Sequence, residues 1–335
     1  MIITKTPFRM SFFGGGTDME DFFKEYGGSV LSTTFDKYCY VNVRHLPRFF
    51  DHLSQITYSK IELVKNTEEI KHPAVREAMK MLDMHELVVV YDADLPARTG
   101  LGTSSSFAVG MIQAFYALKG KYIDKKKLAY EAIHLERELC REEGGWQDQI
   151  AASYGGLNRI DFNGNGFEVH PIIINENRKA ELNKNLLLFF TGFTRFSADI
   201  QKGTKQNLKN KTRNLLEMKN LVYEAERILE DKERSLNEFG CLLNYTWQLK
   251  KEMGDWISID TIDEMYKKAI NAGALGGKLL GAGGGGFLLF YVEPEHQDCV
   301  RNAMEGLLEI PFKFENSGAE IIYYSPEEYP QKYGI

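Results

Sequence analysis

The chain has 335 residues, of which 43% are hydrophobic and 26% are charged, and these ordinary values predict a globular protein of two domains. Its formal net charge of −6 argues against a nucleic-acid-binding protein, because such proteins usually carry a basic excess. No apolar run reaches the roughly 18 residues of a membrane-spanning helix, and the N-terminus lacks the apolar segment of a signal peptide. Its four cysteines form no CxxC pair, which fits a reducing compartment: Cys39, Cys140, Cys241 and Cys299. We therefore expect a cytoplasmic protein that binds neither nucleic acid nor membrane.

In the first half of the chain, strand patterns and helix patterns follow one another. Alternation of apolar and polar residues predicts strands at residues 37–46 and 87–95. Apolar residues at helical spacing predict helices over residues 107–120 and 125–143. An Asn-Gly-Asn-Gly turn at residues 163–166 separates two further strands.

The second half begins with an apolar run at residues 186–190, which predicts a strand. The polar region from 197 to 252 has the pattern of two or three helices, and the segments "GGKLLGAGGGGFLLFYV", "FKFE" and "AEIIYY" indicate strands. The fold class is therefore α+β. The boundary falls near residue 180, which divides the chain into domains 1–180 and 181–335.

The segment "LPARTGLGTSSSFAVG", residues 95–110, runs from a predicted strand through a glycine-rich loop into a predicted helix. The first N–H groups of a helix lack internal partners and carry partial positive charge, and glycines let the backbone approach an anion closely. The segment is neither a Walker A loop nor a Rossmann fingerprint. It predicts a phosphate site, and the alternative is a serine N-cap after a glycine turn.

This segment resembles the phosphate loop of the GHMP kinases, whose pattern is Pro-x-x-x-Gly-Leu-Gly-Ser-Ser. The matching residues are Pro96, Gly100, Leu101, Gly102, Thr103 and Ser104. The resemblance implies that these residues, together with Ser105, bind the phosphates of ATP. It also implies that the Ser104 hydroxyl helps to hold Mg²⁺.

A second segment, "TPFRMSFFGGGTD", is similar to the N-terminal motif of galactokinases through Pro7, Arg9, Gly14, Thr17 and Asp18. The resemblance implies that Arg9 lies near the transferring phosphoryl group and that Asp18 holds sugar hydroxyls. Two glycines, Gly15 and Gly16, replace the glutamate and histidine that galactokinases use on their sugar. They open space for a larger sugar and argue against galactose. Without the resemblance, this segment is a turn with an aspartate cap.

A third segment, "KLLGAGGGGFLLF", satisfies GxGxxG but precedes a predicted strand, so a Rossmann site is excluded by its context. In GHMP kinases a glycine-rich loop at this place supports the phosphate loop and lines the nucleotide site. Four glycines fit that role: Gly281, Gly283, Gly284 and Gly285. Of these, Gly283 and Gly284 are the predicted nucleotide contacts.

The predicted carboxylates lie in "LERELCREEGGWQDQIAASYGG", which resembles the GHMP kinase segment that ends in Met-Asp-Gln. By this resemblance Asp148 faces the substrate hydroxyl, as a base or a positioning group, and acts with Arg9 as the catalytic pair. A regular helix places Glu136 and Glu138 at opposite edges of the apolar stripe and points Arg137 to solvent. Geometry therefore leaves both glutamates open as Mg²⁺ ligands, and the spacing within the family favours Glu136.

Within the superfamily, "FGGGTD", "GGWQDQ" and "LLLFFTGFTR" are most similar to bacterial D-glycero-D-manno-heptose 7-phosphate kinases. The resemblance implies phosphorylation at C1 by ATP and Mg²⁺, which gives a 1,7-bisphosphate for nucleotide-activated heptose and surface polysaccharide. It also implies an N-terminal domain like domain 2 of ribosomal protein S5 and a ferredoxin-like C-terminal domain, with the active site between them.

Two other functions stay open at this point. One is a fucokinase-like kinase of a neutral sugar, and the other is a regulator that binds sugar and ATP without catalysis. The chain keeps Asp148 and the phosphate loop, which favours an enzyme. A substrate phosphate needs a cation, and Arg195 in "TGFTRFSADI" is the predicted substrate-binding arginine, with Lys202 as a weaker candidate.

Overall fold

The computed structural model describes residues 1–97, 99–192, 212–254, 257–281 and 283–326. Nine strands of this described part form the first sheet, in the order β13-β1-β2-β5-β3-β4; β12 and β6 also pair with β2, and β7 pairs with β6. The strands of this sheet are β1 (Ile2–Phe13), β2 (Gly28–His45), β3 (Ser54–Thr57), β4 (Ile61–Val64), β5 (Leu87–Ala93), β6 (Leu157–Asn163), β7 (Gly166–Pro171), β12 (Phe314–Glu315) and β13 (Glu320–Tyr324).

The long strand β2 organises this sheet. It pairs with β1 along most of its length, with β6 at its beginning and with β5 at its end. Arg9 lies in β1 opposite Thr34 of β2, where residues 6–13 of β1 are buried without a break. Because β1 is buried on both faces here, the Arg9 side chain emerges from the interior of the molecule rather than from its surface.

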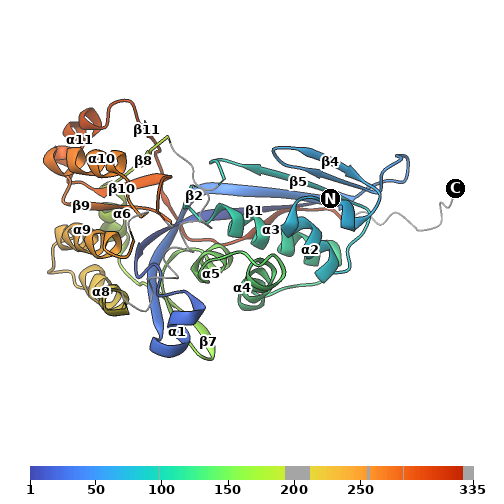
Figure 1. Ribbon diagram of the computed structural model, residues 1–335, viewed down its shortest axis with the longest axis horizontal. Coiled ribbons are helices and arrows are strands. Elements are labelled where there is room, and N and C mark those ends of the chain that lie inside the picture. The colour runs from blue at the N-terminus through green and yellow to red at the C-terminus, as the bar shows by residue number, and fades with distance from the viewer. Residues whose placement is uncertain (98, 193–211, 255–256, 282, 327–335) are drawn as a thin grey trace.

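Five of the described helices lie between strands of the first sheet in the chain: α1 (Glu20–Tyr26), α2 (Pro73–Met81), α3 (Thr103–Leu118), α4 (Lys125–Ile133) and α5 (Gln147–Tyr154). Figure 1 shows α2 to α5 together on one face of the sheet. Helix α3 packs between β1, β2, α4 and α5, and most of its residues are buried. Packing on all sides holds α3 in place, so the position of its N-terminus is set by the core.

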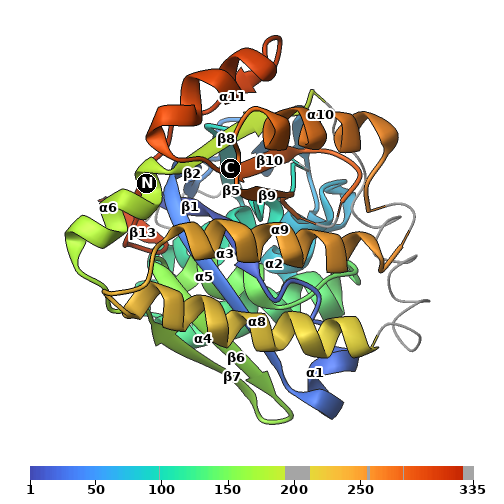
Figure 2. The same cartoon turned by 90° about the vertical axis from the view of Figure 1, so that its left-hand side faces the viewer.

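The second sheet has the order β11-β8-β10-β9, and its neighbouring strands are all antiparallel. Its strands are β8 (Leu186–Phe190), β9 (Gly276–Leu279), β10 (Phe287–Tyr291) and β11 (Leu308–Glu309). The helices of this part of the chain are α6 (Glu176–Lys184), α8 (Thr212–Glu230), α9 (Asn237–Lys251), α10 (Asp260–Asn271), η4 (Pro294–His296) and α11 (Gln297–Ala303). From β8 onward the succession is strand, helices, two strands, helix, strand, with a 4-1-3-2 strand order. This is the predicted ferredoxin-like arrangement. Figure 2 shows α8 and α9 side by side at this end of the molecule.

Most predicted strands are confirmed, because the apolar patterns at residues 37–46 and 87–95 fall within β2 and over β5. The strand at 186–190 is β8, and the turn at 163–166 joins β6 to β7. A single regular helix over residues 125–143 is wrong. Helix α4 ends at Ile133, and the chain goes on directly into a π-helical turn, η2 (His134–Leu139). The wider winding of this turn changes which side chains face inward.

The last strands of the chain return to its beginning. β12 pairs with β2 and β13 pairs with β1, so both belong to the first sheet.

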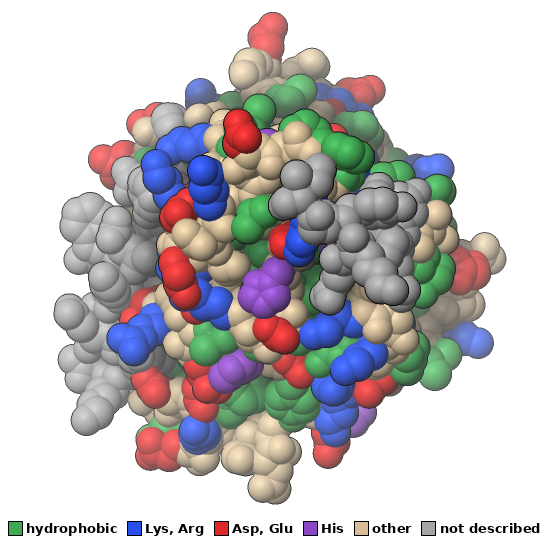
Figure 3. All heavy atoms as spheres, turned by 90° about the vertical axis from the view of Figure 1, so that its right-hand side faces the viewer, with side chains coloured by type: hydrophobic (Ala, Val, Ile, Leu, Met, Phe, Trp, Pro, Cys, Tyr) green, Lys and Arg blue, Asp and Glu red, His purple; other side chains and the backbone are tan. Residues whose placement is uncertain are grey.

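The domain boundary at residue 180 stays a prediction. None of the described helices is both long and apolar enough to cross a membrane. On the face drawn in Figure 3, basic and acidic side chains are interspersed over the described surface.

Candidate active site

The phosphate-loop segment and the N-terminal segment meet at the start of α3. The Ser106 hydroxyl donates to the carbonyl of Pro7 over 2.9 Å, and the backbone N–H of Arg9 donates to the carbonyl of Leu101 over 3.1 Å. The Arg9 guanidinium also donates to the carbonyl of Gly100 over 2.6 Å. Segments about 90 residues apart in the chain therefore form one structural unit.

Helix α3 begins at Thr103 after Gly102, which has φ 72°, and no side chain of the described residues caps this N-terminus. The alternative of a serine N-cap is therefore wrong. Ser104 is exposed, whereas Ser105 and Ser106 are buried. The loop itself is closed by the Thr99 hydroxyl, which donates to the carbonyl of Pro96 over 2.9 Å. An uncapped helix N-terminus behind a glycine loop can bind phosphate oxygens through its backbone N–H groups.

The two glycine-rich loops touch each other through their backbones. A Cβ on Gly100 would lie 3.0 Å from the Cα of Gly281, and a Cβ on Gly281 would overlap the Cα of Gly100. Both residues have positive φ, 81° and 79°, which an L side chain rarely adopts. The third motif thus supports the phosphate loop, as the sequence predicts.

Gly283 and Gly284, the predicted nucleotide contacts, have other neighbours. Gly284 donates its N–H to the carbonyl of Ile257 over 3.1 Å, and Gly283 lies against the backbone of the same residue. These two glycines therefore hold the segment between α9 and α10. Their contact with a nucleotide remains a prediction.

Glu136 lies in the π-helical turn, and its side chain is buried, with the residue only 1% exposed. One carboxylate oxygen accepts a hydrogen bond from the Ser104 hydroxyl over 2.8 Å, and the other accepts one from the Ser105 hydroxyl over 2.6 Å and one from the Gln149 amide. Glu138 is exposed and pairs with His134 over 3.0 Å. The π-helical turn therefore separates two glutamates that a regular helix leaves equivalent.

The same turn changes the position of Arg137. Its guanidinium donates to the carbonyls of Glu142 and Glu143 and is largely buried, so the expectation that it points to solvent is wrong. The extra width of the turn brings this side chain against the loop that leads to α5.

Ser104 and Glu136 together fit a magnesium ion. Mg²⁺ prefers oxygen ligands and usually takes one or two from the protein. A carboxylate hydrogen-bonded to an exposed hydroxyl at the N-terminus of α3 offers these ligands. This fit supports the predicted pair, Ser104 and Glu136, and gives no reason to choose Glu138.

We expect Glu136→Gln to raise the Mg²⁺ concentration required for half-maximal activity by about 10-fold or more, because the change removes a charged ligand. Glu138→Gln is the matched control, since it removes the same charge two residues away at an exposed position. Titration of Mg²⁺ against the activity of both variants measures the effect. A larger shift for Glu138→Gln would show that the metal binds at Glu138, and the assignment to Glu136 would be wrong.

Asp148 and Arg9 form an ion pair at the N-terminus of α3. The guanidinium approaches Oδ1 of Asp148 with two nitrogens at 2.7 Å each. A Cβ on Gly102 would lie 3.2 Å from Cγ of Arg9 and 3.5 Å from the Asp148 carboxylate. The Asp148 side chain is 24% exposed, so the carboxylate is open on one side. The pair can orient a hydroxyl with one member and neutralise a phosphoryl group with the other.

Asp18 is buried beside this pair. Its carboxylate accepts the backbone N–H groups of Gly16 over 2.9 Å and of Gln147 over 3.3 Å. Burial raises the pKa of Asp18, and the negative charge of Asp148 adds to the increase. Asp18 thus joins the glycine turn to the first turn of α5, which carries Asp148, and its contact with a sugar remains a prediction.

Gly15 and Gly16 lie in the turn that the Asp18 carboxylate closes. A Cβ on Gly15 would meet its nearest neighbours, the Ser11 hydroxyl and the Gln147 amide, only at 3.7 and 3.9 Å. A Cβ on Gly16 would meet Leu215 at 3.2 Å and Met253 at 3.7 Å. The missing side chain therefore leaves a small space at Gly15, whereas Leu215 of α8 and Met253, two residues after α9, crowd the position of Gly16.

Two lysines near the ion pair were not predicted from the sequence. Lys250 of α9 and Lys278 of β9 are both buried. Burial lowers the pKa of Lys250 to about 8, and burial lowers the pKa of Lys278 well below its usual value. The charges of Arg9 and Asp18 also act on the pKa of each of them, Arg9 to lower it and Asp18 to raise it. A lysine inside the apolar run "GGKLLG", and one at helical spacing from Trp247, are signals that could have identified them.

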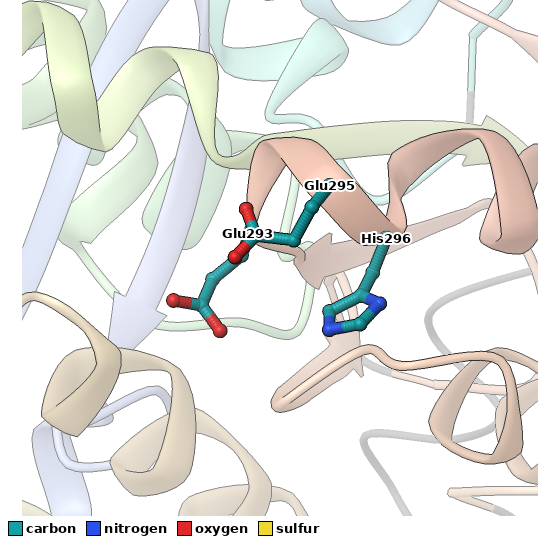
Figure 4. Close-up of side chains that lie close together, drawn as sticks. All are labelled: Glu293, Glu295 and His296. Atoms are coloured by element: carbon teal, nitrogen blue, oxygen red, sulfur yellow. The ribbon is translucent and has the colours of Figure 1, made fainter.

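The two predicted cations and one further cluster of possible ligands remain to be placed. Arg195 and Lys202, the predicted phosphate-binding cations, are outside the described residues. Among the described residues, Glu293, Glu295 and His296 bring possible metal ligands together at η4, as Figure 4 shows. Glu293 already accepts a hydrogen bond from Asn237 over 2.6 Å, and Glu295 and His296 are exposed. This surface cluster contains none of the predicted ligands.

Comparison with known proteins agrees with the geometry. Residues 69–156 match the N-terminal domain of the GHMP kinases, and residues 225–309 match their C-terminal domain. A D-glycero-alpha-D-manno-heptose 7-phosphate kinase of Campylobacter jejuni is 33% identical over 88% of this chain and 90% of its own length. A bifunctional fucokinase/GDP-fucose pyrophosphorylase of Arabidopsis thaliana is 27% identical over 70% of this chain but only 23% of its own length.

A solved structure has the same architecture. The crystal structure of a D-glycero-D-manno-heptose 1-phosphate kinase from Bacteroides thetaiotaomicron superposes with a TM-score of 0.76, over 95% of this chain and 98% of that one, at 23% identity. This likeness confirms the predicted two-domain α+β fold. Both domain matches, the full-length relative and the shared fold lead to one conclusion. The chain belongs to the GHMP kinases, and it is an ATP-dependent kinase.

Proposed function

We propose that this enzyme transfers a phosphoryl group from ATP to the anomeric C1 hydroxyl of D-glycero-D-manno-heptose 7-phosphate and forms the 1,7-bisphosphate. The product would feed the synthesis of nucleotide-activated heptose for surface polysaccharide. That the chain is an ATP-dependent sugar kinase follows from its family and from the full-length relative. The choice of sugar is supported by the name of that relative and by the two glycines, Gly15 and Gly16, that replace the glutamate and histidine of galactokinases.

The observation that carries the proposal is the Arg9–Asp148 pair, which lies between the uncapped N-terminus of α3 and the space at Gly15. Nucleotide phosphates can bind on one side of this pair and an acceptor hydroxyl on the other. Phosphoryl transfer depends mainly on positioning and on neutralisation of charge, and this arrangement offers both.

Each residue then has a defined part. The backbone of Gly100 to Ser105 binds and orients the phosphates of ATP. Ser104 and Glu136 would hold Mg²⁺, which supplies positive charge to the phosphate oxygens. Asp148 orients the acceptor hydroxyl or takes its proton, and Arg9 stabilises charge on the transferring group. An anomeric hydroxyl is more acidic than an ordinary alcohol, so a carboxylate is an adequate base for it.

The proposal also includes the position of the phosphate on the sugar substrate. One relative is named for heptose 7-phosphate, whereas the protein of the solved structure is named for heptose 1-phosphate. Arg195, outside the described residues, remains the predicted cation for the 7-phosphate. A kinase of a neutral sugar, as in the fucokinase relative, is the second candidate, and a regulator without turnover is the third.

The test is ADP release from Mg·ATP in the presence of heptose 7-phosphate, heptose, fucose or mannose. We expect heptose 7-phosphate to give the highest kcat/KM of the four. A higher value for fucose would replace the proposed substrate by a neutral sugar. No ADP release with any of them, in a protein that binds ATP, would support the regulator.

Gly15→Val is expected to raise the KM for the sugar by about 10-fold or more and to leave the KM for ATP unchanged. The Cβ of the new side chain would lie at ordinary contact distances from the Ser11 hydroxyl and the Gln147 amide, 3.7 and 3.9 Å, so the fold should tolerate it. Gly164→Val is the control, because a Cβ there meets no atom within 4 Å and the residue lies in the β6–β7 turn. Equal sugar KM values for the two variants would place the sugar elsewhere.

A further inference from the structure

Lys250 lies in the last turn of α9 and is only 8% exposed. Its ammonium group donates a hydrogen bond to the carbonyl of Gly281, in the glycine-rich loop that follows β9. The neighbouring Lys251 is partly exposed and pairs instead with Asp263 of α10 over 3.3 Å. Of these two adjacent lysines, one therefore faces solvent and the other enters the interior between α9 and the loop.

The place that Lys250 reaches is opposite Arg9. Gly281, which binds Lys250, touches Gly100, and the carbonyl of Gly100 binds Arg9. Two cations are thus held by the carbonyls of two touching glycines, at the base of the phosphate loop. Asp18 and Lys278 are the other charged groups that act on Lys250 at this place.

The hydrogen-bonding capacity of Lys250 is not filled by the part of the chain that the structure describes. An ammonium group has three N–H donors, and the described residues offer Lys250 one acceptor, the carbonyl of Gly281. Asp148 is engaged by Arg9, and Asp18 is engaged by two backbone N–H groups. A buried cation with free donors needs a ligand rich in oxygen and negative charge.

We propose that the Lys250 ammonium binds a phosphoryl group beside Arg9, as a second cation of the active site. The ligand chemistry is a phosphoryl dianion, which can come from the γ-phosphate of ATP or from the phosphate ester of the sugar. This inference rests on the proposed function, since it assigns a residue to the same site. It adds a phosphate contact from the C-terminal domain, on an element that contains none of the predicted site residues.

The charge state of Lys250 gives the proposal a pH signature. Because its pKa is lowered to about 8 by burial and by Arg9, the free enzyme loses this positive charge as the pH rises through that value. Asp18 acts in the opposite direction, and Lys278, with its own pKa well below the usual value, adds repulsion while it is charged. A bound phosphoryl group favours the protonated form. kcat/KM, which reports the free enzyme, should therefore fall above about pH 8.

The direct experiment is calorimetric titration of the full chain with inorganic pyrophosphate, for the wild type and for Lys250→Met and Lys251→Met. We expect Lys250→Met to weaken binding by about 10-fold or more and Lys251→Met to leave it within twofold. Equal affinities for the two variants would overturn the proposal. The probe contains no sugar, so this result is independent of the proposed substrate.

Steady-state kinetics distinguish the two sources of the phosphoryl group. If Lys250 binds the phosphate of the sugar, Lys250→Met raises the KM for heptose 7-phosphate and leaves the constants for heptose unchanged. If it binds the transferring group, kcat falls by about 10-fold or more with both sugars. Unchanged constants in both arms would contradict the proposal. If heptose 7-phosphate did not react at all, the proposed function would be contradicted. The pyrophosphate titration would then decide by itself whether Lys250 binds a phosphoryl group.

Lys250→Arg covers the case in which Lys250→Met does not fold. Arginine keeps its charge at all accessible pH values, so the decline of kcat/KM above about pH 8 should disappear in this variant. A purely structural lysine would not alter the pH profile. An identical decline in the wild type and in Lys250→Arg would therefore refute the role of the Lys250 charge.

Discussion

Asp148→Asn is expected to lower kcat by about 10²-fold or more, while the fold and the affinity for ATP remain. The amide cannot accept the proton of the sugar hydroxyl, and it carries no charge to hold the Arg9 guanidinium at 2.7 Å. Arg9 keeps its bond to the carbonyl of Gly100, so the phosphate loop should stay in place. Single-turnover measurements with saturating ATP and sugar separate this loss from any change in binding.

Asp161→Asn provides the matched control for this variant. Asp161 pairs with Arg159 over 3.0 Å, and its side chain is 26% exposed, close to the 24% of Asp148. It lies in β6, away from the phosphate loop. We expect its turnover to stay within twofold of the wild type. A folded Asp148→Asn protein with near-normal turnover would remove Asp148 from the mechanism.

Gly281→Ala is expected to reduce the free energy of unfolding by about 3 kcal/mol or more and to weaken ATP binding by at least about 10-fold. Alanine at φ 79° is strained, and its Cβ would overlap the Cα of Gly100. The phosphate loop must then move away from the loop that supports it. Urea unfolding and calorimetric binding of a non-hydrolysable ATP analogue measure the two effects.

Gly120→Ala separates backbone strain from the clash. Gly120 has φ 64°, but a Cβ there meets no atom within 4 Å. Its cost should be the strain alone, about 1 kcal/mol, with unchanged ATP binding. If both variants lost the same stability and Gly281→Ala bound the ATP analogue normally, the contact between the two glycine loops would have no part in ATP binding.

The parts of the site that the sequence predicts are those carried by local patterns. The phosphate loop, with Gly100 and Ser104, is a continuous segment between a strand and a helix. The strand at 186–190 is a continuous apolar run, and its bounds are those observed for β8. The ferredoxin-like order of the second sheet follows from the resemblance, because strand order is not contained in any local pattern.

The parts that the sequence misses depend on packing between distant segments. Burial of Glu136 results from a π-helical turn, whereas a fixed 100° rotation per residue leaves it equivalent to Glu138. Lys250 belongs to the site only because α9 packs against the loop after β9, which in turn packs on Gly100. Gly283 and Gly284 are read as nucleotide contacts from their motif, yet their observed neighbour is Ile257.

The measurement that tests the central claim most directly is ³¹P NMR of the product formed from Mg·ATP and heptose 7-phosphate. The arrangement of Arg9 and Asp148 beside the phosphate loop leads us to expect ADP and a sugar with two phosphate esters. The new phosphorus should couple to the anomeric proton, and the signal of the 7-phosphate should persist. A new phosphate on any other carbon, or no new ester while another sugar is phosphorylated, would contradict the proposed reaction.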